Sequence, residues 1–426
     1  MIAKCLSGAR HPRRSPSLLI VGRLGASALT LISAPIVARA LGPEGRGETA
    51  AAIALFIIVP VVLGFGLPLE VRRQSATSDG RAVIRAARKI TIFSFPAALI
   101  IGVLAYLFLF DGFSSDGRVV AAVGVALAPL STSWALDVSV LVAHRRYGGV
   151  LLIQLLQPAV YLFLILLFFS LDIAMVSTVL AASIAGTSAT FCVGLWLVRV
   201  PMRGQQVNMR DLLRRSFAFS GSAIAEAASN RADQIIALPL IGAYQAGLYS
   251  VAATVGSLPF AIGQALGASY FTPIAQATGA RRAELQSEAV RAAIAASSMT
   301  IPLIAVAAWP ALPIIFGEEF APAVPATMAA LLGSAALLTA YVASIALAAE
   351  GRGFRMTLGQ LISLVCGVSG LFILGPPLGA VGAALASTLG YFTLLTVLLL
   401  SLRLPARSLA PRPTEFMQVL QRLKRD

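Results

Sequence analysis

The stretch ALGPEGRG at residues 40–47 lies between two long apolar runs, and a second copy of its pattern, LIGAYQAG, follows at residues 240–247. Aligning the copies pairs Gly42 with Gly242 and Gly47 with Gly247. We expect these four glycines to form structural turns, because glycine accepts backbone conformations that other residues avoid. A pattern that recurs after about 200 residues in an apolar chain predicts a membrane protein of two similar halves, an arrangement typical of transporters.

The composition places the chain in a bilayer. Of its 426 residues, 58% are hydrophobic and 12% are charged, and the mean hydropathy is +0.85. Soluble domains carry roughly 25% charged residues, so this chain could not cover a water-facing surface. Lipid satisfies no backbone hydrogen bonds, so spanning segments must be helices or a closed barrel. The apolar runs have the length of about 20 residues that a spanning helix needs.

Composition also excludes several functions. The net charge of +15 could suggest nucleic acid, but the basic residues fall in loops between apolar runs, which indicates membrane orientation instead. Cys5, Cys192 and Cys366 are far apart, and His11 and His144 are isolated, so neither a disulfide framework nor a metal site is predicted. No catalytic spacing or phosphate-binding loop with its lysine is present. We therefore expect no enzyme activity and no cofactor.

The apolar runs predict an all-α polytopic membrane protein with about twelve transmembrane helices. The first run, from about Leu18, is long enough to span and lacks a clear cleavage site, so we expect a retained helix rather than a signal peptide. The expected spans are 17–41, 48–70, 90–110, 119–143, 149–170, 173–198, 216–241, 245–271, 292–316, 322–349, 356–375 and 379–402.

The distribution of positive charge orients these spans. If both termini lie on one side, 28 of the 33 Lys and Arg residues lie on that side. The exceptions are Arg39, Arg46 and Arg118 on the opposite side, and Arg23 and Arg231 within spans. The positive-inside rule therefore predicts cytoplasmic termini. Because both halves start inside, they form a parallel repeat: a six-helix lobe at 1–198, a cytoplasmic linker at 199–215, a second six-helix lobe at 216–402 and a basic tail at 403–426.

Several short motifs resemble one family. LGPEGRG at 41–47, NRAD at 230–233, GAYQAGLY at 242–249, IFGEEF at 315–320 and LGAVGAA at 378–384 are similar to segments of Wzx-type polysaccharide biosynthesis flippases. These belong to the multidrug/oligosaccharidyl-lipid/polysaccharide (MOP) exporter superfamily.

The resemblance implies two lobes around a central cavity that opens alternately to each side of the bacterial inner membrane. It also implies a cargo, a polyprenyl-pyrophosphate-linked oligosaccharide moved to the outer leaflet for cell-surface polysaccharide biosynthesis. Expected partners are membrane lipids, H⁺ or Na⁺ as a coupling ion, and glycosyltransferases or a polymerase of the same pathway, but no nucleic acid. The peptidoglycan-precursor flippases of the superfamily usually carry two further helices, for which this chain has no room.

Charged residues inside spans are the site candidates, because a charge at mid-membrane costs about 2.5–3.5 kcal/mol on insertion scales. Span seven carries Glu226, Asn230 and Asp233 on one helical face, with Arg231 beside them. Ser222 and Ser229 extend this stripe. Span one carries a shorter counterpart made of Arg23, Ser27 and Thr30. Because spans one and seven are equivalent in the repeat, we expect both stripes to face the space between the lobes.

Two interpretations remain for each of these groups. Arg23 and Arg231 could bind the cargo pyrophosphate, since a guanidinium donates two parallel hydrogen bonds to phosphate. Alternatively, Arg231 pairs with an acid that locks helices together, and Arg23 reaches the headgroups. Glu226 and Asp233 could bind a coupling cation or proton, or they could release the arginines between states. Asp137, in span four, either lines the cavity or pairs with an arginine.

Two other functions remain open at this stage. A multidrug exporter of the same superfamily would fit twelve helices, although a cation exporter should have an acid-dominated cavity, whereas Arg23 and Arg231 favour an anionic headgroup. A membrane component of a glycan synthase complex is the second alternative. The expected outer loops are under ten residues long, which argues against a polymerase.

Overall fold

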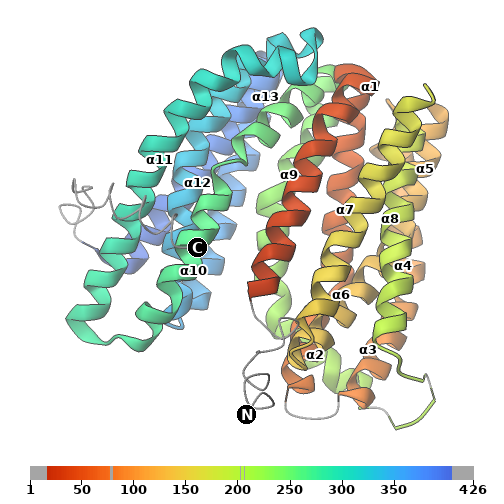
Figure 1. The fold of residues 1–426 in the computed structure, drawn as a ribbon, viewed down its shortest axis with the longest axis vertical. Helices are drawn as coiled ribbons and strands as arrows, with labels where there is room; N and C mark the ends of the chain where they lie inside the picture. The colour runs from red at the N-terminus through yellow and green to blue at the C-terminus, as the bar shows by residue number, and fades with distance from the viewer. Residues whose placement is uncertain (1–16, 77–79, 202, 206, 405–426) are drawn as a thin grey trace, which may run out of the picture. The chain divides into compact units, whose positions relative to one another are not determined.

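The computed structural model of the chain describes residues 17–76, 80–201, 203–205 and 207–404, and these ranges contain helices but no strand. Most of the predicted basic tail, and four basic residues of the N-terminus, lie outside them. The elements, labelled in Figure 1, are α1 (Ser17–Gly64), α2 (Leu67–Ser75), α3 (Arg81–Phe93), α4 (Phe95–Phe108), α5 (Ser115–Ala126), α6 (Ala128–Ala143), α7 (Tyr147–Ser170), α8 (Val176–Leu197), α9 (Met209–Gly256), α10 (Phe260–Gln276), α11 (Gly279–Phe316), η3 (Glu318–Ala323), α12 (Val324–Ala349) and α13 (Gly353–Leu402).

The predicted all-α membrane fold is confirmed. Within the described residues, eight helices are long and apolar enough to cross a membrane, or nine if α5 and α6, bent by 40°, form one span. Three of them are 44, 54 and 50 residues long, enough for two crossings of about 20 residues each. If each of these three helices crosses the membrane twice, the number of spans rises from nine to twelve. The structure does not contain a membrane, so twelve spans stay a prediction.

The breaks in the long helices fall at single glycines. Gly42 in α1 has φ 65° and ψ −176°, Gly242 in α9 has φ 81° and ψ 162°, and Gly379 in α13 has φ 56° and ψ −129°. A positive φ is strained for residues with a Cβ but open to glycine. The turns predicted at 42–47 and 242–247 are therefore narrower than the sequence indicates: one residue is non-helical, and the helix resumes at Pro43 and Ala243.

The edge of the second predicted span also differs. The sequence predicts an unbroken span 48–70, whereas α1 ends at Gly64. Phe65 and Gly66 have φ 43° and 74°, and the short helix α2 then starts at Leu67, with Pro68 in its first turn. The left-handed pair stops the helix at Gly64, six residues before Glu70, which therefore lies in α2, outside the candidate spans.

Contacts along the chain divide it into two compact units. Unit 1 comprises Met1–Leu41 and Ala52–Ala227, and unit 2 comprises Gly42–Ala51 and Ala228–Asp426. Ten residues of α1 thus belong to the unit that contains the second half of the sequence. The domain boundaries inferred from the sequence, at 198 and 216, remain a prediction.

Each unit has an apolar core between its helices. In unit 1, α5 packs against α4 and α8, α7 packs against α8, and α2 and α3 pack against α6. At the end where α2 and α3 lie, Val71, Ile84 and Leu136 belong to one buried cluster. In unit 2, α12 packs against α10, α11 and α13, and Leu338 and Ala343 belong to one buried cluster.

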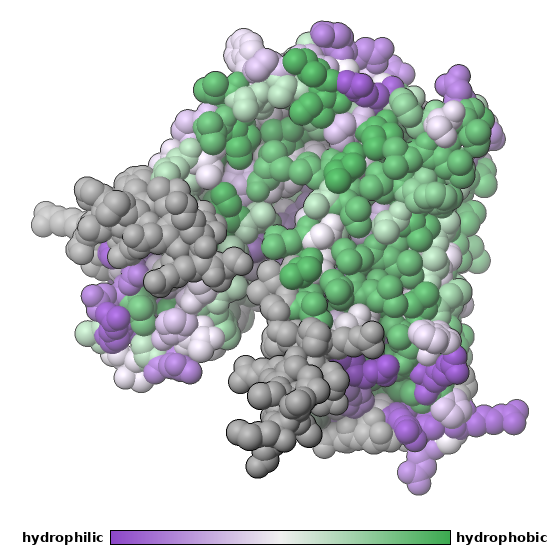
Figure 2. Space-filling model, in the orientation of Figure 1, coloured by the Kyte–Doolittle hydropathy of each residue, from purple (hydrophilic) through white to green (hydrophobic). Residues whose placement is uncertain are grey.

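The outer surface is as apolar as the core. Phe108 and Phe163 in unit 1, and Leu303 and Val306 in unit 2, expose at least 65% of their surface. Figure 2 shows this for unit 1, where an apolar face is bordered by hydrophilic residues at the lower end. Such a surface is stable only in lipid, so the protein is a multi-pass membrane protein.

The two glycine segments meet within unit 2. A Cβ at Gly47 would overlap the carbonyl oxygen of Ala243 and lie 2.8 Å from the amide nitrogen of Gly247. A Cβ at Gly247 would overlap the carbonyl oxygen of Pro43. Gly47 and Gly247 are helical, so they serve close backbone packing, whereas Gly42 and Gly242 supply the breaks.

Candidate functional site

The polar residues predicted on span one lie on the first part of α1. Arg23, Ser27 and Thr30 are exposed, and Ala34, one further position along the same face, is buried. The Thr30 hydroxyl donates a 2.9 Å hydrogen bond to the Ala26 carbonyl, within its own helix. No ion pair of Arg23 occurs within the described residues, so its guanidinium is accessible to a ligand or to lipid headgroups.

The predicted stripe on span seven divides between the units. Glu226 belongs to unit 1, and Asn230, Arg231 and Asp233 belong to unit 2. Glu226 and Asn230 are exposed, whereas Arg231 and Asp233 are half-buried. Arg231 Nη1 lies 3.4 Å from Gln234 Oε1, one helical turn away. The expectation that both stripes face one space stays a prediction. The side chain of Ser222 lies outside the described residues, so its place in the stripe also stays a prediction.

Asp233 is the centre of a polar network inside unit 2. The hydroxyls of Tyr249 and Ser387 both donate to Asp233 Oδ2, the latter at 3.1 Å. The two hydroxyl oxygens lie 2.7 Å apart. The Gln234 amide donates to Asp233 Oδ1 at 2.8 Å. The network joins both parts of α9 to α13 and gives the carboxyl the hydrogen bonds that a buried polar group needs.

Sequence reasoning missed both hydroxyl partners. Tyr249 is 2% exposed and ends the motif GAYQAGLY at the start of the expected span 245–271, where the sequence indicates a family resemblance but no partner. Ser387 carries no sequence signal, because one serine in an apolar helix is common. Together the carboxylate and the two hydroxyls offer only hard oxygen atoms, which suit a proton or a hard cation. No cluster of three or more His, Cys, Asp or Glu occurs among the described residues.

Asp137 pairs with an arginine, one of the two outcomes left open by its sequence. Arg88 Nη2 of α3 lies 2.6 Å from Asp137 Oδ1 of α6 and also donates to the Val198 carbonyl at 2.8 Å. Asp137 is fully buried and Arg88 is 7% exposed. Removing one partner of such a pair leaves a buried charge, which costs about 3–5 kcal/mol. Asp137 therefore connects α3, α6 and the end of α8.

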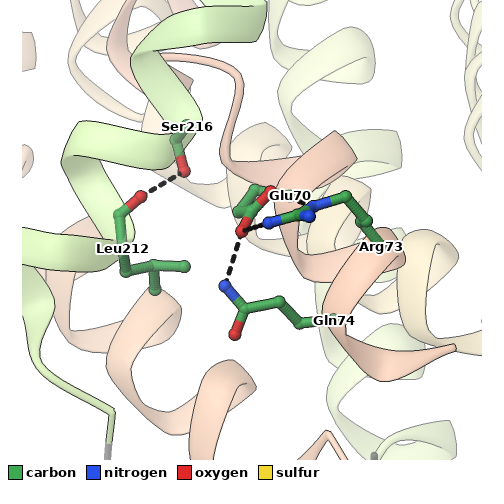
Figure 3. A network of polar contacts seen from close by, with 5 residues as sticks. All are labelled: Glu70, Arg73, Gln74, Leu212 and Ser216. Atoms are coloured by element: carbon green, nitrogen blue, oxygen red, sulfur yellow. Dashed lines mark hydrogen bonds and ion pairs between the residues drawn. The ribbon is translucent and has the colours of Figure 1, made fainter. Parts of the chain in front are cut away.

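A second acid, Glu70 in α2, was not among the candidates. Its carboxylate is fully buried and accepts from Arg73 Nε at 2.8 Å, Arg73 Nη2 at 2.7 Å and Gln74 Nε2 at 2.6 Å. Figure 3 shows this group beside the start of α9, where the Ser216 hydroxyl donates to the Leu212 carbonyl at 2.8 Å. The hydrogen bonds from Arg73 are the largest cause that lowers the pKa of Glu70 below its usual range, and burial opposes them.

Comparison with known proteins gives the family context. A family model described as "Polysaccharide biosynthesis protein" matches residues 13–277, more than half of the 426 residues. No curated protein sequence matches the chain at a significant level.

Solved structures with a similar fold include two kinds of transporter. The structure titled "Lipid II flippase MurJ, inward closed conformation" has a TM-score of 0.74 and 13% identity, over 95% of this chain and 90% of that one. A multidrug resistance MATE family transporter of the MOP superfamily, in its inward-facing conformation, has a TM-score of 0.67 and 16% identity, over 95% and 99%. These likenesses show the fold, and with the family match they confirm the resemblance predicted from the motifs.

Proposed function

Since the chain belongs to the polysaccharide biosynthesis protein family, we propose that it moves a polyprenyl-pyrophosphate-linked oligosaccharide from the cytoplasmic to the outer leaflet by alternating access. The family match carries this proposal, and the fold of a lipid II flippase over 95% of the chain supports it. The two lobes, the linker and the inner-membrane location with cytoplasmic termini are parts of the same proposal. Glycosyltransferases or a polymerase would supply and consume the glycan.

We assign recognition of the cargo to two arginines. Arg23 is exposed on α1 and free of ion pairs within the described residues, and Arg231 is half-buried on α9 with Gln234 as a neighbour. A guanidinium matches a pyrophosphate by paired, charge-assisted hydrogen bonds. Ser27, Thr30 and Asn230 offer further donors, for sugar hydroxyls.

We assign ion coupling to Asp233. One carboxyl oxygen, Oδ2, accepts hydrogen bonds from the hydroxyls of both Tyr249 and Ser387. Protonation or deprotonation of Asp233 would therefore change the hydrogen bonds that join the two parts of α9 to each other and to α13. Glu226, exposed two turns earlier on α9, would receive the ion from the cavity. H⁺ or Na⁺ would then drive the change between inward-open and outward-open states.

A second candidate is export of cationic drugs. The likeness to a multidrug resistance transporter over 95% of the chain, together with a half-buried carboxyl at Asp233, favours this function. The two functions make opposite demands on Arg231. An anionic cargo needs its charge, whereas a cationic drug is repelled by it.

The test is translocation by the purified full-length protein in proteoliposomes. A fluorescent polyprenyl-pyrophosphate-linked oligosaccharide in the inner leaflet becomes accessible to an external quencher only after it crosses. Arg231→Ala should slow crossing by about tenfold or more, since a hydrogen bond to a charged group is worth about 1.5–3 kcal/mol. Asp233→Ala should abolish the dependence on an ion gradient.

Arg210→Ala, which removes an exposed arginine at the start of α9, is the matched control. This variant should move the lipid-linked oligosaccharide across the membrane at the wild-type rate. Unchanged crossing in both Arg231→Ala and Asp233→Ala would sink the site assignment. If the wild-type protein moves no lipid-linked glycan but accumulates an organic cation, and Arg231→Ala increases that accumulation, the drug-export function replaces the proposed one.

A further inference from the structure

Unit 1 contains a cavity of about 600 Å³ that none of the proposed transport steps uses. Three parts of unit 1 form its wall. These are α3 with the start of α4, then α6, and finally the end of α8 with residues 199–201. Figure 1 shows α3 and the chain after α8 at the same end of unit 1. Pockets that hold small molecules have volumes of about 300–1,000 Å³, so the cavity is large enough for one ligand.

The wall of the cavity is mostly apolar. Ile92, Phe95, Phe191 and Leu195 supply the larger side chains. Ile92 is 53% exposed, and the adjacent Phe93 is 70% exposed, so this side of unit 1 faces the bilayer. An apolar cavity beside lipid accommodates a hydrocarbon chain, because contact with its wall replaces contact with other acyl chains.

The polar part of the wall is basic. Arg88 is committed to Asp137 by the 2.6 Å ion pair, which neutralises its charge. Arg199 is different: it is exposed, and its guanidinium lies 5.5 Å from the ring centroid of Trp196. No ion pair of Arg199 occurs in the described part of the chain, so the cavity has one uncompensated positive charge at its rim.

A donor without a partner points to a polar ligand group. Ser133 lines the cavity and is 6% exposed, and its hydroxyl has no hydrogen bond within the described ranges. The hydroxyl can therefore donate a hydrogen bond to a group that enters the cavity. A ligand oxygen in the cavity would satisfy it.

Neighbouring residues place the cavity at the level of lipid headgroups. Trp196 is 60% exposed, and tryptophan gathers where hydrocarbon meets headgroups. Arg85 and Lys89 on α3 and Arg203 after α8 extend the basic surface on the same side. The Arg85 guanidinium donates to the Arg203 carbonyl at 3.2 Å. This surface attracts anionic lipids, as basic juxtamembrane segments do.

We propose that the cavity binds one anionic phospholipid of the leaflet on its own side. The phosphate pairs with Arg199, an ester oxygen accepts a hydrogen bond from Ser133, and an acyl chain lies along Ile92, Phe95 and Leu195. Bound lipid ties α3 and α4 to α6 and α8, the helices that the ion pair of Arg88 and Asp137 already connects. This site is separate from cargo transport and does not depend on the proposed function.

The experiment counts bound lipid by native mass spectrometry of the full-length protein. Delipidated protein is titrated with phosphatidylglycerol and, separately, with phosphatidylcholine. Arg199→Ala removes the charge, Leu195→Trp fills the apolar part, and Arg210→Ala is the control, an exposed arginine outside the cavity wall. Ile92→Trp, at a half-exposed wall position, replaces Leu195→Trp if the latter is not monodisperse.

Wild-type protein should bind one phosphatidylglycerol in preference to phosphatidylcholine. Arg199→Ala should weaken binding of phosphatidylglycerol by about fivefold, the effect of one basic residue near an anionic lipid surface. The filling variant should also weaken it, because the new side chain takes the space of the acyl chain. Three results overturn the proposal: equal binding of both lipids, an equal loss in Arg210→Ala, or no loss in the filling variant. Displacement of the bound lipid by polyprenyl phosphate would also overturn it, by assigning the cavity to the cargo.

Discussion

Glu70 is a buried carboxylate that stays charged because three donors from its own helix surround it. Arg73 and Gln74 reach back to it over one turn of α2. The hydrogen bonds come from α2 alone, and Arg215 on α9 adds a smaller favourable charge. Its stabilising effect depends on the carboxylate remaining ionised.

The pH dependence of stability tests this role. Since the folded-state pKa of Glu70 is lowered, its stabilisation is fully present above the unfolded value of about 4.3 and is lost as pH falls through the folded value. We expect wild-type protein to unfold at a higher temperature than Glu70→Gln at pH 7, with a difference that shrinks below about pH 4. Thermal unfolding of the purified protein across this range measures it.

A second variant isolates the cause. Arg73→Ala leaves Glu70 buried with Gln74 alone, so acid should destabilise this variant less than it destabilises the wild type. If wild-type and Glu70→Gln midpoints differ by the same amount at pH 7 and well below about pH 4, the Arg73 hydrogen bonds are not what holds the carboxylate.

The sequence identified the charged residues that lie inside apolar runs, but it did not identify the residues that they contact. Asp137 and Asp233 stood out as charges in apolar runs, and both are held by specific contacts. Their partners, Arg88 for the first and Tyr249 with Ser387 for the second, lie 16 to 154 positions away. Periodicity reports which face of one helix a residue occupies, but not which helix lies opposite, so these pairs could not be predicted.

At the scale of elements, the glycine pairs divide two tasks between them. Gly42 and Gly242 supply a left-handed backbone, and nothing lies within 4 Å of a Cβ built on Gly242. Gly47 and Gly247 supply space, because each faces the backbone of the other segment. Each copy of the repeated pattern therefore has one glycine that allows a positive φ and one that leaves room for close backbone packing.

Alanine substitutions separate the two tasks. Gly47→Ala and Gly247→Ala should each destabilise the protein by about 1–3 kcal/mol or more, because backbone atoms must move. Gly242→Ala should cost about 1–2 kcal/mol from its positive φ alone. Gly221→Ala, in an open part of α9, should stabilise by about 0.5–1 kcal/mol. The thermal unfolding midpoints of the four variants give the order, and equal midpoints for Gly47→Ala and Gly221→Ala would contradict the packing.

Apolar runs located the helices and the breaks near Gly42, Gly242 and Gly379, but not the end of α1. The end of α1 at Gly64 depends on the left-handed Phe65 and Gly66, which local hydropathy does not detect. At the break near Gly379, hydropathy does not reveal the contact beside it: Gln245 Oε1 accepts a 3.0 Å hydrogen bond from the Ala380 amide. That amide is available because the helix is interrupted, and its acceptor comes from a distant part of α9.

For the whole molecule, the count of basic residues predicts that both termini lie in the cytoplasm. The test uses single cysteines in a chain without Cys5, Cys192 and Cys366. Glu44→Cys and Asp116→Cys, at exposed outer positions, should react with a membrane-impermeant maleimide in intact cells. His144→Cys and Arg281→Cys should react only after permeabilisation, and the reverse pattern would refute the orientation.

The place of Gly42–Ala51 in unit 2 has a consequence for biosynthesis. The backbone that Gly47 packs against, at Ala243 and Gly247, is translated about 200 residues later. At about 5–20 residues per second, this segment waits roughly 10–40 seconds for its partner. During that interval the nascent first half carries an unfilled packing surface at residues 42–51, and its maturation cannot finish before the second copy of the pattern has left the ribosome.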